Sequence, residues 1–425
     1  MEILKLVLGI TIFLVTFYFI ISEKYPKSLV TIAGGCLMVV SGILDEEQAL
    51  QTIGYNLEII FLLVGMMMIV EIMSETGIFQ WVAIKIAQLV KGEPIKILIL
   101  LSVVTGVFSA VLDNVTTILL VVPVTIFLAK RLETDPKIFI LIQIFMSNIG
   151  GTATMIGDPP NLIIGSLGGI GFNDFIINLA PLVIINTVIL LATMTLYFRK
   201  KLVVSRELKA SIMELDLSRT ITDKKLLVQS LILFLIVIIG FLTNSITKIG
   251  LSTIAILGSM ILIFVSKKDP EKIFEKIEWE TLFFFGGLFI LVEGIESLGI
   301  IKRFGEHIIM LTNGNLKLTS SLILIISTIL SPIIGSIPHA LSFGKIILEI
   351  IPSYTGNTQV LWWALSLGAC LGGNMTIVGA AANIVGSSVS KKAGIEISFK
   401  EFFKWGLIVV AESTIISLIY INIRY

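Results

Sequence analysis

Long apolar runs constrain this chain more than any other feature of its sequence. Crossing the hydrocarbon core of a bilayer takes about 20 residues of α-helix, and many runs approach that length. With 56% hydrophobic residues, 14% charged residues and a mean hydropathy of +1.00, the composition lies far from that of soluble proteins. The sequence therefore predicts an all-α polytopic membrane protein. The predicted crossings are residues 3–21, 28–43, 56–74, 179–198, 226–243, 251–266, 281–297 and 403–421.

Polar residues, glycines and prolines interrupt other apolar segments. The block GGTATMIGDPPN, residues 150–161, predicts a helix to about Gly150, an unwound stretch, and a half-helix from Pro159. The sequence LDNVTT, residues 112–117, predicts a hairpin tip, and IIGSIPHAL, residues 333–341, predicts a second one. Such discontinuous backbone is tolerated at membrane depth only where it is buried in protein or lines a wet cavity.

An internal repeat with one constant offset relates the two halves of the chain. Gly65, Glu71 and Gly77 match Gly287, Glu293 and Gly299, and residues 150–161 match 372–383 at the same offset. Because each half has an odd number of crossings, the second copy must enter from the opposite face. We therefore expect two inverted-topology repeats, each with five transmembrane helices and a re-entrant hairpin. Repeat 1 is 1–198, a charged cytoplasmic linker is 199–225, and repeat 2 is 226–425.

The positively charged residues suggest an orientation in the membrane. Most of the 31 Lys and Arg residues, including those of the linker, fall on one side of this topology. The positive-inside rule makes that side the cytoplasm, so both termini are expected outside. The first apolar run lacks a small-residue cleavage site, which favours a retained helix over a signal peptide.

Asp113 and Asp158 lie in the middle of apolar segments. A carboxylate at mid-bilayer costs about 2.5–3.5 kcal/mol on insertion scales, which favours a functional role. The alternative is that each caps the helix that follows it, and both roles are compatible. At the equivalent positions the second half has Gly335 and Ala380. The hypothesis is one cation or proton site in the first half, completed by neutral groups from the second. The candidate substrate- and ion-binding residues are Asp113, Asn114, Thr116, Thr117, Thr152, Thr154, Asp158, Asn161, Ser336, His339, Asn374, Thr376 and Asn383.

Other polar residues have simpler interpretations. His339 could titrate near neutral pH, although a hydrogen-bonded structural role is equally expected. Lys345 and Glu349 have the i,i+4 spacing of a local ion pair. Cys36 and Cys370 lie in apolar surroundings, so we expect reduced structural residues and neither a disulfide nor a metal site.

Four blocks carry a resemblance to known transporters: LDNVTTILLVVPVTI, SNIGGTATMIGDPPN, WETLFFFGGLFILVEGIESLGII and LWWALSLGACLGGNMTIVGAAANIV. The chain resembles the ion-transporter superfamily of arsenite permeases, NhaD-type sodium/proton antiporters, the melanosomal P protein and, more distantly, dicarboxylate transporters. The resemblance implies about ten helices, two opposed hairpins and an elevator-type or related alternating-access movement. Relatives of the P-protein type carry an Asp-Asn-Ile-Pro tip where this chain has Gly335-Ser336-Ile337-Pro338. This difference counts against carrying over a two-ion stoichiometry.

The sequence favours secondary active transport over other functions. It contains no G-x-x-x-x-G-K-[ST] loop for ATP hydrolysis, and no G-x-S-x-G or H-E-x-x-H motif of a hydrolase. We therefore expect no enzyme activity and no cofactor, with H⁺ or Na⁺ as the coupling ion. The first hypothesis is proton-coupled export of arsenite or antimonite, whose neutral hydroxides suit hydroxyl and amide groups. Alternatives are sodium/proton antiport and transport of a small anion or carboxylate; a channel is less favoured.

The expected partners follow from the same hypothesis. They are a small inorganic solute and the lipid bilayer, and no nucleic acid. The resemblance leaves a homodimer and a separate ATPase subunit open. The expected location is the plasma membrane of a bacterium or archaeon, as a multi-pass protein.

Overall fold

A computed structural model describes residues 2–22 and 24–425, and these residues form α-helices, 3-10 turns and connections with no β-strand. The all-α prediction is confirmed. The first half contains α1 (Glu2–Ser22), α2 (Lys27–Val40), α3 (Glu46–Tyr55), α4 (Leu57–Ser74), α5 (Ile78–Leu89), α6 (Pro94–Val111), α7 (Asn114–Arg131), α8 (Pro136–Gly151), α9 (Pro159–Gly168) and α10 (Phe172–Phe198). The second half contains α12 (Lys224–Thr247), α13 (Leu251–Ser266), α14 (Pro270–Phe274), α15 (Trp279–Ser297), α16 (Ile300–Thr312), α17 (Leu316–Ile334), α18 (Ser336–Ile350), α19 (Gln359–Gly372), α20 (Ala381–Lys392) and α21 (Phe399–Arg424).

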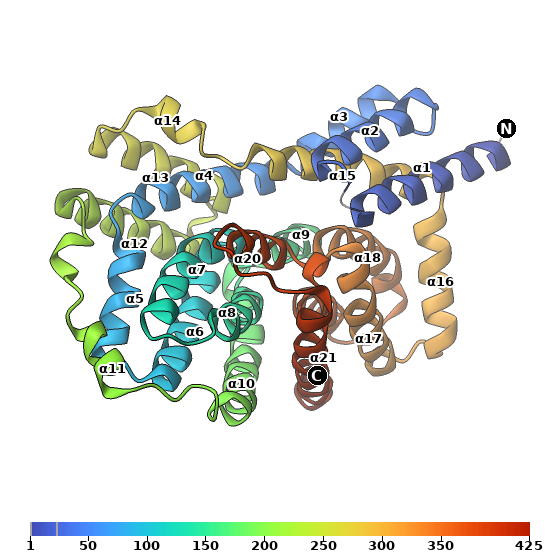
Figure 1. Ribbon diagram of the computed structural model, residues 1–425. Helices are drawn as coiled ribbons and strands as arrows, with labels where there is room; N and C mark the ends of the chain where they lie inside the picture. Colours follow the sequence, from blue (N-terminus) through green and yellow to red (C-terminus); the bar gives the residue numbers. More distant parts are fainter. Residues whose placement is uncertain (1, 23) are drawn as a thin grey trace.

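The helices form two layers (Figure 1). The upper layer contains α1–α4 and α12–α15, and the lower layer contains α6–α10 and α17–α21. Helices α5 and α16 run along opposite edges and join the layers. Each follows a sharp turn at a glycine with positive φ, +78° at Gly77 and +70° at Gly299. Glycine adopts this left-handed conformation without the steric cost of a Cβ atom.

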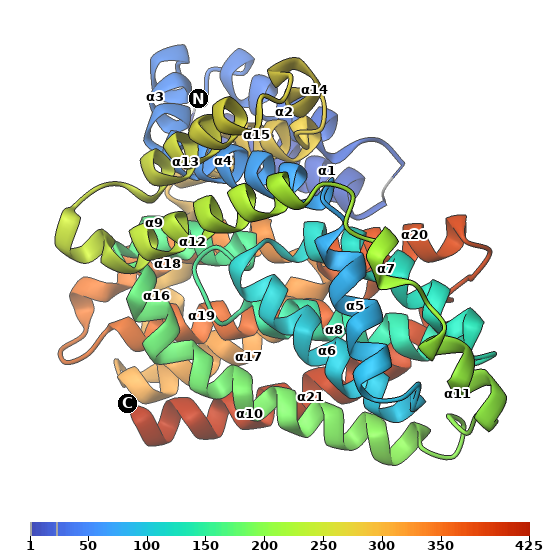
Figure 2. The same cartoon turned by 90° about the vertical axis from the view of Figure 1, so that its left-hand side faces the viewer.

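The helix starts recur with the offset seen in the sequence. Helices α4 and α15 begin at Leu57 and Trp279, and α7 and α18 begin at Asn114 and Ser336, so both pairs keep the spacing of Gly65 and Gly287. The two sets of helices follow the same order. In Figure 2, α7 and α20 lie toward the right and α18 and α9 toward the left. Both termini lie toward the left of that view and α11 toward the right.

The two halves are interlocked by helix exchange. Helix α13 packs against α4 of the first half, and α2 packs against α15 of the second. Each contact depends on a glycine, because a Cβ atom at Gly65 would lie 2.6 Å from the carbonyl carbon of Ala255, and one at Gly287 would lie 2.5 Å from the backbone of Ile32. In the lower layer, α7 packs on α20 and α18 on α9.

Helix lengths revise the predicted crossings. Eight of the described helices are long and apolar enough to cross a membrane: α1, α4, α6, α7, α10, α12, α17 and α21. The predicted crossings 28–43 and 251–266 are shorter helices, α2 and α13, of 14 and 16 residues. Helices α15 and α16 are bent by 69° at their junction. Helices α6 and α7 have 18 residues each, which is close to the length of a full bilayer crossing. That this hairpin re-enters the membrane without crossing it stays a prediction.

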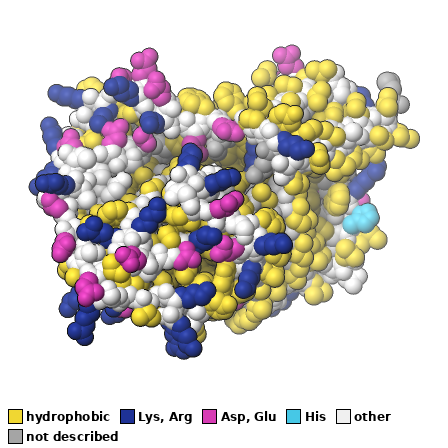
Figure 3. Space-filling view, in the orientation of Figure 1, with side chains coloured by type: hydrophobic (Ala, Val, Ile, Leu, Met, Phe, Trp, Pro, Cys, Tyr) yellow, Lys and Arg dark blue, Asp and Glu magenta, His cyan; other side chains and the backbone are white. Residues whose placement is uncertain are grey.

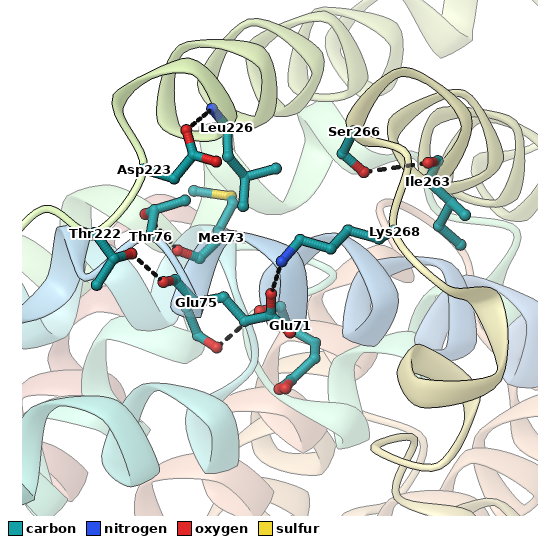
Figure 4. A network of polar contacts seen from close by, with 11 residues as sticks. Glu71, Met73, Glu75, Thr76, Thr222, Asp223, Leu226, Ile263, Ser266 and Lys268 are labelled. Carbon is teal, nitrogen blue, oxygen red and sulfur yellow. Dashed lines mark hydrogen bonds and ion pairs between the residues drawn. The ribbon is translucent and has the colours of Figure 1, made fainter.

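The linker lies against the first half of the chain. It contains α11 (Arg206–Met213) and a 3-10 turn, η1 (Leu217–Arg219). At its end, the Thr222 hydroxyl donates to the Glu75 carbonyl oxygen at 2.6 Å, and the Glu75 side chain forms an ion pair with Lys268 (Figure 4). Figure 3 shows many charged side chains on the left of the molecule and a largely hydrophobic right side.

Candidate functional site

Two helix breaks meet in the lower layer. Helix α8 ends at Gly151 and α9 begins at Pro159, and Asp158 between them is extended, with φ −142° and ψ 129°. In the second half, the 3-10 turns η3 (Gly373–Met375) and η4 (Ile377–Gly379) separate α19 from α20. Turn η3 contacts α8. The break predicted at residues 150–161 is confirmed, and the matching residues 372–383 repeat it.

Glycines allow each break to fold back on itself. A Cβ atom at Gly151 would lie 2.4 Å from the carbonyl oxygen of Gly157, and one at Gly379 would lie 2.4 Å from that of Gly373. Real Cβ atoms do not approach backbone oxygen so closely. Threonines then fix the loops, because Thr154 Oγ1 donates to the Ala110 carbonyl oxygen at 2.5 Å, and its counterpart Thr376 donates to that of Pro332 at 2.6 Å.

The two helical hairpins differ at their tips. Asp113 caps α7 by accepting a hydrogen bond from the Thr116 backbone N–H at 2.8 Å and another from the Thr116 hydroxyl. The predicted capping role is therefore confirmed for Asp113. It is wrong for Asp158, whose side chain makes no capping hydrogen bond to α9. Thr117 donates to the Asp113 carbonyl oxygen at 2.8 Å. At the second tip, Gly335 has φ +90° and the adjoining Ser336 is buried, so this tip offers a hydroxyl where the first offers a carboxylate.

A continuous chain of hydrogen bonds joins the first-half carboxylate to the second-half break, and we call it the amide network. Asn114 Nδ2 donates to Asp158 Oδ1 at 3.0 Å and to Asn148 Oδ1 at 3.2 Å. Asn148 Nδ2 donates to Asn374 Oδ1 at 2.8 Å and to Asn383 Oδ1 at 2.7 Å. All five side chains are at most 2% exposed. The network therefore carries one carboxylate and four amides into a buried region.

The network has unused hydrogen-bonding capacity. Among the described residues, Asp158 Oδ2, Asn114 Oδ1 and Asn374 Nδ2 are buried and have no protein partner. Buried polar atoms are almost always satisfied, so such atoms call for an explanation. Two oxygen atoms that can receive a cation or proton, and one amide donor, are available here. These atoms are what a binding site would present.

A second branch lies beside the network. Asn161 Nδ2 donates to the carbonyl oxygens of Thr152 and Thr154 at 3.2 and 2.9 Å. Ser366 Oγ from the second half donates to Asn161 Oδ1 at 2.6 Å, and Cys370 Sγ lies 3.5 Å from the same oxygen. Asn161 therefore holds the unwound stretch in place. Asn383 fixes the second break in the same way, through Gly373 and Thr376.

A cavity of about 500 Å³ opens beside the two tips. It is lined by Asp113, Ser336 and Pro159, by residues of α1, α4, α15 and α20, and by Glu278 and Glu280 at the start of α15. Lys24 and Lys27 also line it. The cavity thus lies between the upper and lower layers, with three acidic side chains in its wall.

A smaller cavity of about 250 Å³ lies at the equivalent place in the other half. It is lined by Glu58 and Leu162, which are the repeat counterparts of Glu280 and Ile384 in the larger cavity. Helix α20 lines the larger cavity and α9 lines the smaller one, and these two helices lie on opposite sides in Figure 2. The structure is therefore more open at one end of the site than at the other.

Most predicted site residues gather around the network, but His339 and the Thr152 hydroxyl do not belong to it. Asp113, Asn114, Asp158, Asn161, Ser336, Asn374 and Asn383 lie in the network, its branch or the cavity wall. His339 is fully buried and packs its ring on Phe343, and within residues 2–22 and 24–425 neither of its nitrogens has a hydrogen-bond partner. The hydrogen-bonded structural role expected for His339 is therefore wrong, and its ring does not line the cavity. The Thr152 hydroxyl donates to the Asn148 carbonyl oxygen, which is local helix bonding.

Sequence analysis missed two residues. Asn148 is the centre of the amide network, and Glu278 faces the cavity beside Asp113. The block SNIGG contains Asn148, and an amide at mid-span was the available signal. Within the described residues no group of three His, Cys, Asp or Glu side chains could hold a metal ion.

Comparison with known proteins identifies the family. A family model described as citrate transporter matches residues 17–368 of the chain. The chain belongs to the citrate transporter family. This citrate transporter family member is 40% identical over 423 residues to a 46 kDa membrane protein of Mycobacterium leprae, covering 99% of both chains. It is also 38% identical to an uncharacterized transporter of Mycobacterium tuberculosis, over 99% of this chain and 98% of the relative.

The predicted resemblance to the P protein is confirmed. The chain is 31% identical over 490 residues to the P protein of Sus scrofa, covering 96% of this chain and 58% of that protein. The family member is thus a membrane transporter with several transmembrane helices. This agrees with the expected location in the plasma membrane. The amide network is the part of this transporter where a solute or ion is expected to bind.

Proposed function

We propose that the chain is a proton- or sodium-coupled secondary transporter with a single coupling site at Asp158, and that it exports arsenite or antimonite. The observation that carries the coupling site is the unpartnered Oδ2 of Asp158, buried beside the unpartnered Oδ1 of Asn114. An ionised carboxylate buried without a partner is costly. Binding a proton or Na⁺ offsets that cost, so occupancy of the site stabilises the closed, desolvated arrangement.

The repeat supports a single coupling ion. Ala380 and Ser336 occupy the positions that correspond to Asp158 and Asn114. The second half therefore supplies neutral donors and acceptors, from Ser336, Asn374 and Asn383, and no second carboxylate at this place. A neutral oxyacid such as arsenite, with three hydroxyl groups at neutral pH, suits these groups because it needs no cationic partner.

The two cavities support alternating access. One is about 500 Å³ and the other about 250 Å³, at equivalent places in the two halves. The larger cavity is lined by Lys24 and Lys27, which belong to the side that the positive-inside rule makes cytoplasmic. In this arrangement the site would be open to the cytoplasm, the side from which an exporter loads.

Citrate and Na⁺ are the rival solutes. The family description names citrate, and a cavity of about 500 Å³ is large enough for it. Its carboxylates would lie in a wall that contains Asp113, Glu278 and Glu280 as well as Lys24 and Lys27. Sodium/proton antiport is favoured by the two free oxygens of Asp158 and Asn114.

The test is transport by the purified full-length protein in proteoliposomes. Arsenite, citrate and sodium are supplied in turn, with and without a pH gradient, and the transported solute is measured inside the vesicles. We expect gradient-driven arsenite transport that Asp158→Asn abolishes. Asp135→Asn is the matched control, because Asp135 caps α8 outside the network. Transport of citrate or sodium without arsenite would reject the proposed solute, and unchanged transport in Asp158→Asn would reject the coupling site.

A further inference from the structure

We propose that Asn148 is the positioning residue that couples cation binding at Asp158 to solute binding by the second half. This inference rests on the proposed function and deepens it. Asn148 lies on α8, is fully buried, and is the one side chain through which Asn114 and Asp158 connect to Asn374 and Asn383 in the described hydrogen bonds.

Within the amide network, the two halves meet at the single amide group of Asn148. Asn148 Oδ1 accepts from Asn114 at 3.2 Å, while Nδ2 donates to Asn374 at 2.8 Å and to Asn383 at 2.7 Å. An amide is planar, and its oxygen and nitrogen move together. A reorientation that improves the bond to Asn114 therefore changes both bonds to the second half.

Cation binding at Asp158 changes the hydrogen bond that the Asn148 amide accepts from Asn114. Asn114 Nδ2 is shared between Asp158 Oδ1 and Asn148 Oδ1. When Asp158 binds a proton or Na⁺, its oxygen becomes a weaker acceptor, and the Asn114 donor shifts toward Asn148. Hydrogen bonds in a chain polarise one another in a low dielectric, so the bonds from Asn148 to Asn374 and Asn383 then strengthen. Asn374 is the member of that pair with a free Nδ2, which is available to a solute.

The second half has no corresponding connection. Cys370 is the repeat counterpart of Asn148 and offers only a weak S–H donor, 3.5 Å from Asn161 Oδ1. Asn161 already uses its own Nδ2 on the carbonyl oxygens of Thr152 and Thr154. Gln143 is a matched control for Asn148, because it is a buried amide on the same helix that donates to Thr125 Oγ1, outside the network.

The experiment measures coupling directly. Arsenite affinity of the purified full-length protein is titrated with and without saturating sodium, and again at low and high pH. Coupling between two sites typically changes affinity about 5- to 150-fold, and the same factor must appear in the cation affinity with and without arsenite. We expect a factor in that range in the wild type and in Gln143→Ala. In Asn148→Ala we expect the factor to fall to about 1, while arsenite and cation each still bind.

A ratio of affinities separates coupling from general damage. A variant that merely distorts the site weakens both titrations and leaves the coupling factor in place. Asn148→Cys, which copies the equivalent residue of the second half, is the second variant if Asn148→Ala does not fold. A wild-type coupling factor retained in both Asn148 variants would overturn the inference. A wild type that binds neither arsenite nor a cation would instead overturn the proposed function, and the inference with it.

Discussion

The Lys345 ammonium nitrogen lies 2.6 Å from Oε2 of Glu296 and 3.3 Å from Oε2 of Glu293, so α18 of the lower layer is joined to α15 of the upper layer. The sequence expectation that Lys345 forms a local pair with Glu349 is therefore wrong. All three side chains are less than a third exposed. The first half has Pro123 in place of Lys345, so this ion pair belongs to the second half alone.

Replacing Lys345 should destabilise the protein. Lys345→Gln leaves two carboxylates close together and partly buried, with an expected cost of about 1–2 kcal/mol after allowance for partial exposure to solvent. Thermal unfolding in detergent measures it. Lys302→Gln, an exposed change on α16, is the control. Adding Glu296→Gln to Lys345→Gln should recover part of the loss, and an unchanged melting temperature in Lys345→Gln would contradict the ion-pair role.

Gly77 and Gly299 offer a matched test of linker docking. Both have positive φ, so alanine costs about 1–2 kcal/mol at either position. Only at Gly77 would the Cβ atom also clash with the linker, at the Thr220 carbonyl oxygen, whereas a Cβ atom at Gly299 would meet open space among the described residues. Gly77→Ala should therefore lose a further amount of about 1–3 kcal/mol and expose the linker to protease. Equal melting temperatures for the two variants would show that the linker does not hold this turn.

Neighbouring glycines of α15 test the helix exchange. A Cβ atom at Gly287 would lie 2.5 Å from the backbone of α2, while a Cβ atom at Gly286 would meet open space among the described residues. Gly286→Ala should stabilise the protein by about 0.5–1 kcal/mol, because alanine is the better helix former. Gly287→Ala should instead separate α15 from α2 and lower the melting temperature. The same direction of change in both variants would contradict close packing at Gly287.

Asp113 allows its capping role to be separated from its charge. Asparagine also caps helices well, so Asp113→Asn should keep the stability of α7, whereas Asp113→Ala should lose about 0.5–2 kcal/mol. Transport assays on the two variants then report on the charge itself. If Asp113 also serves cation entry from the cavity, both variants should slow transport. Normal transport in Asp113→Asn, with loss only in Asp113→Ala, would leave capping as its sole role.

Features of the site that depend on local backbone chemistry were predicted from the sequence. Proline disfavours helical backbone at the residue before it and suits the first turn of a helix. The start of α9 at Pro159 followed from this property, and the interruption around Asp113 followed from the polar residues between two apolar segments. The repeat was visible for the same reason, since matched glycines mark matched turns.

Contacts between helices that are distant in the sequence could not be predicted in this way. Local spacing pairs Lys345 with Glu349, but its partners lie on another helix. The role of Asn148 could not be predicted from local spacing either, because its partners come from three other segments. The predicted crossing 28–43 runs past the end of α2 at Val40, because hydropathy does not show where a short helix ends, whereas 251–266 has the bounds of α13.

By itself, the sequence determined that this protein is an all-α membrane protein with two related halves and interrupted helices. Those properties follow from apolar run length, helix-breaking residues and a constant offset, all of which are local. Only the tertiary structure decided that the halves exchange helices, that one buried carboxylate connects through Asn148 to the other half, and that one cavity is larger than its counterpart. These features depend on which side chains meet after packing, and packing is a property of the whole chain.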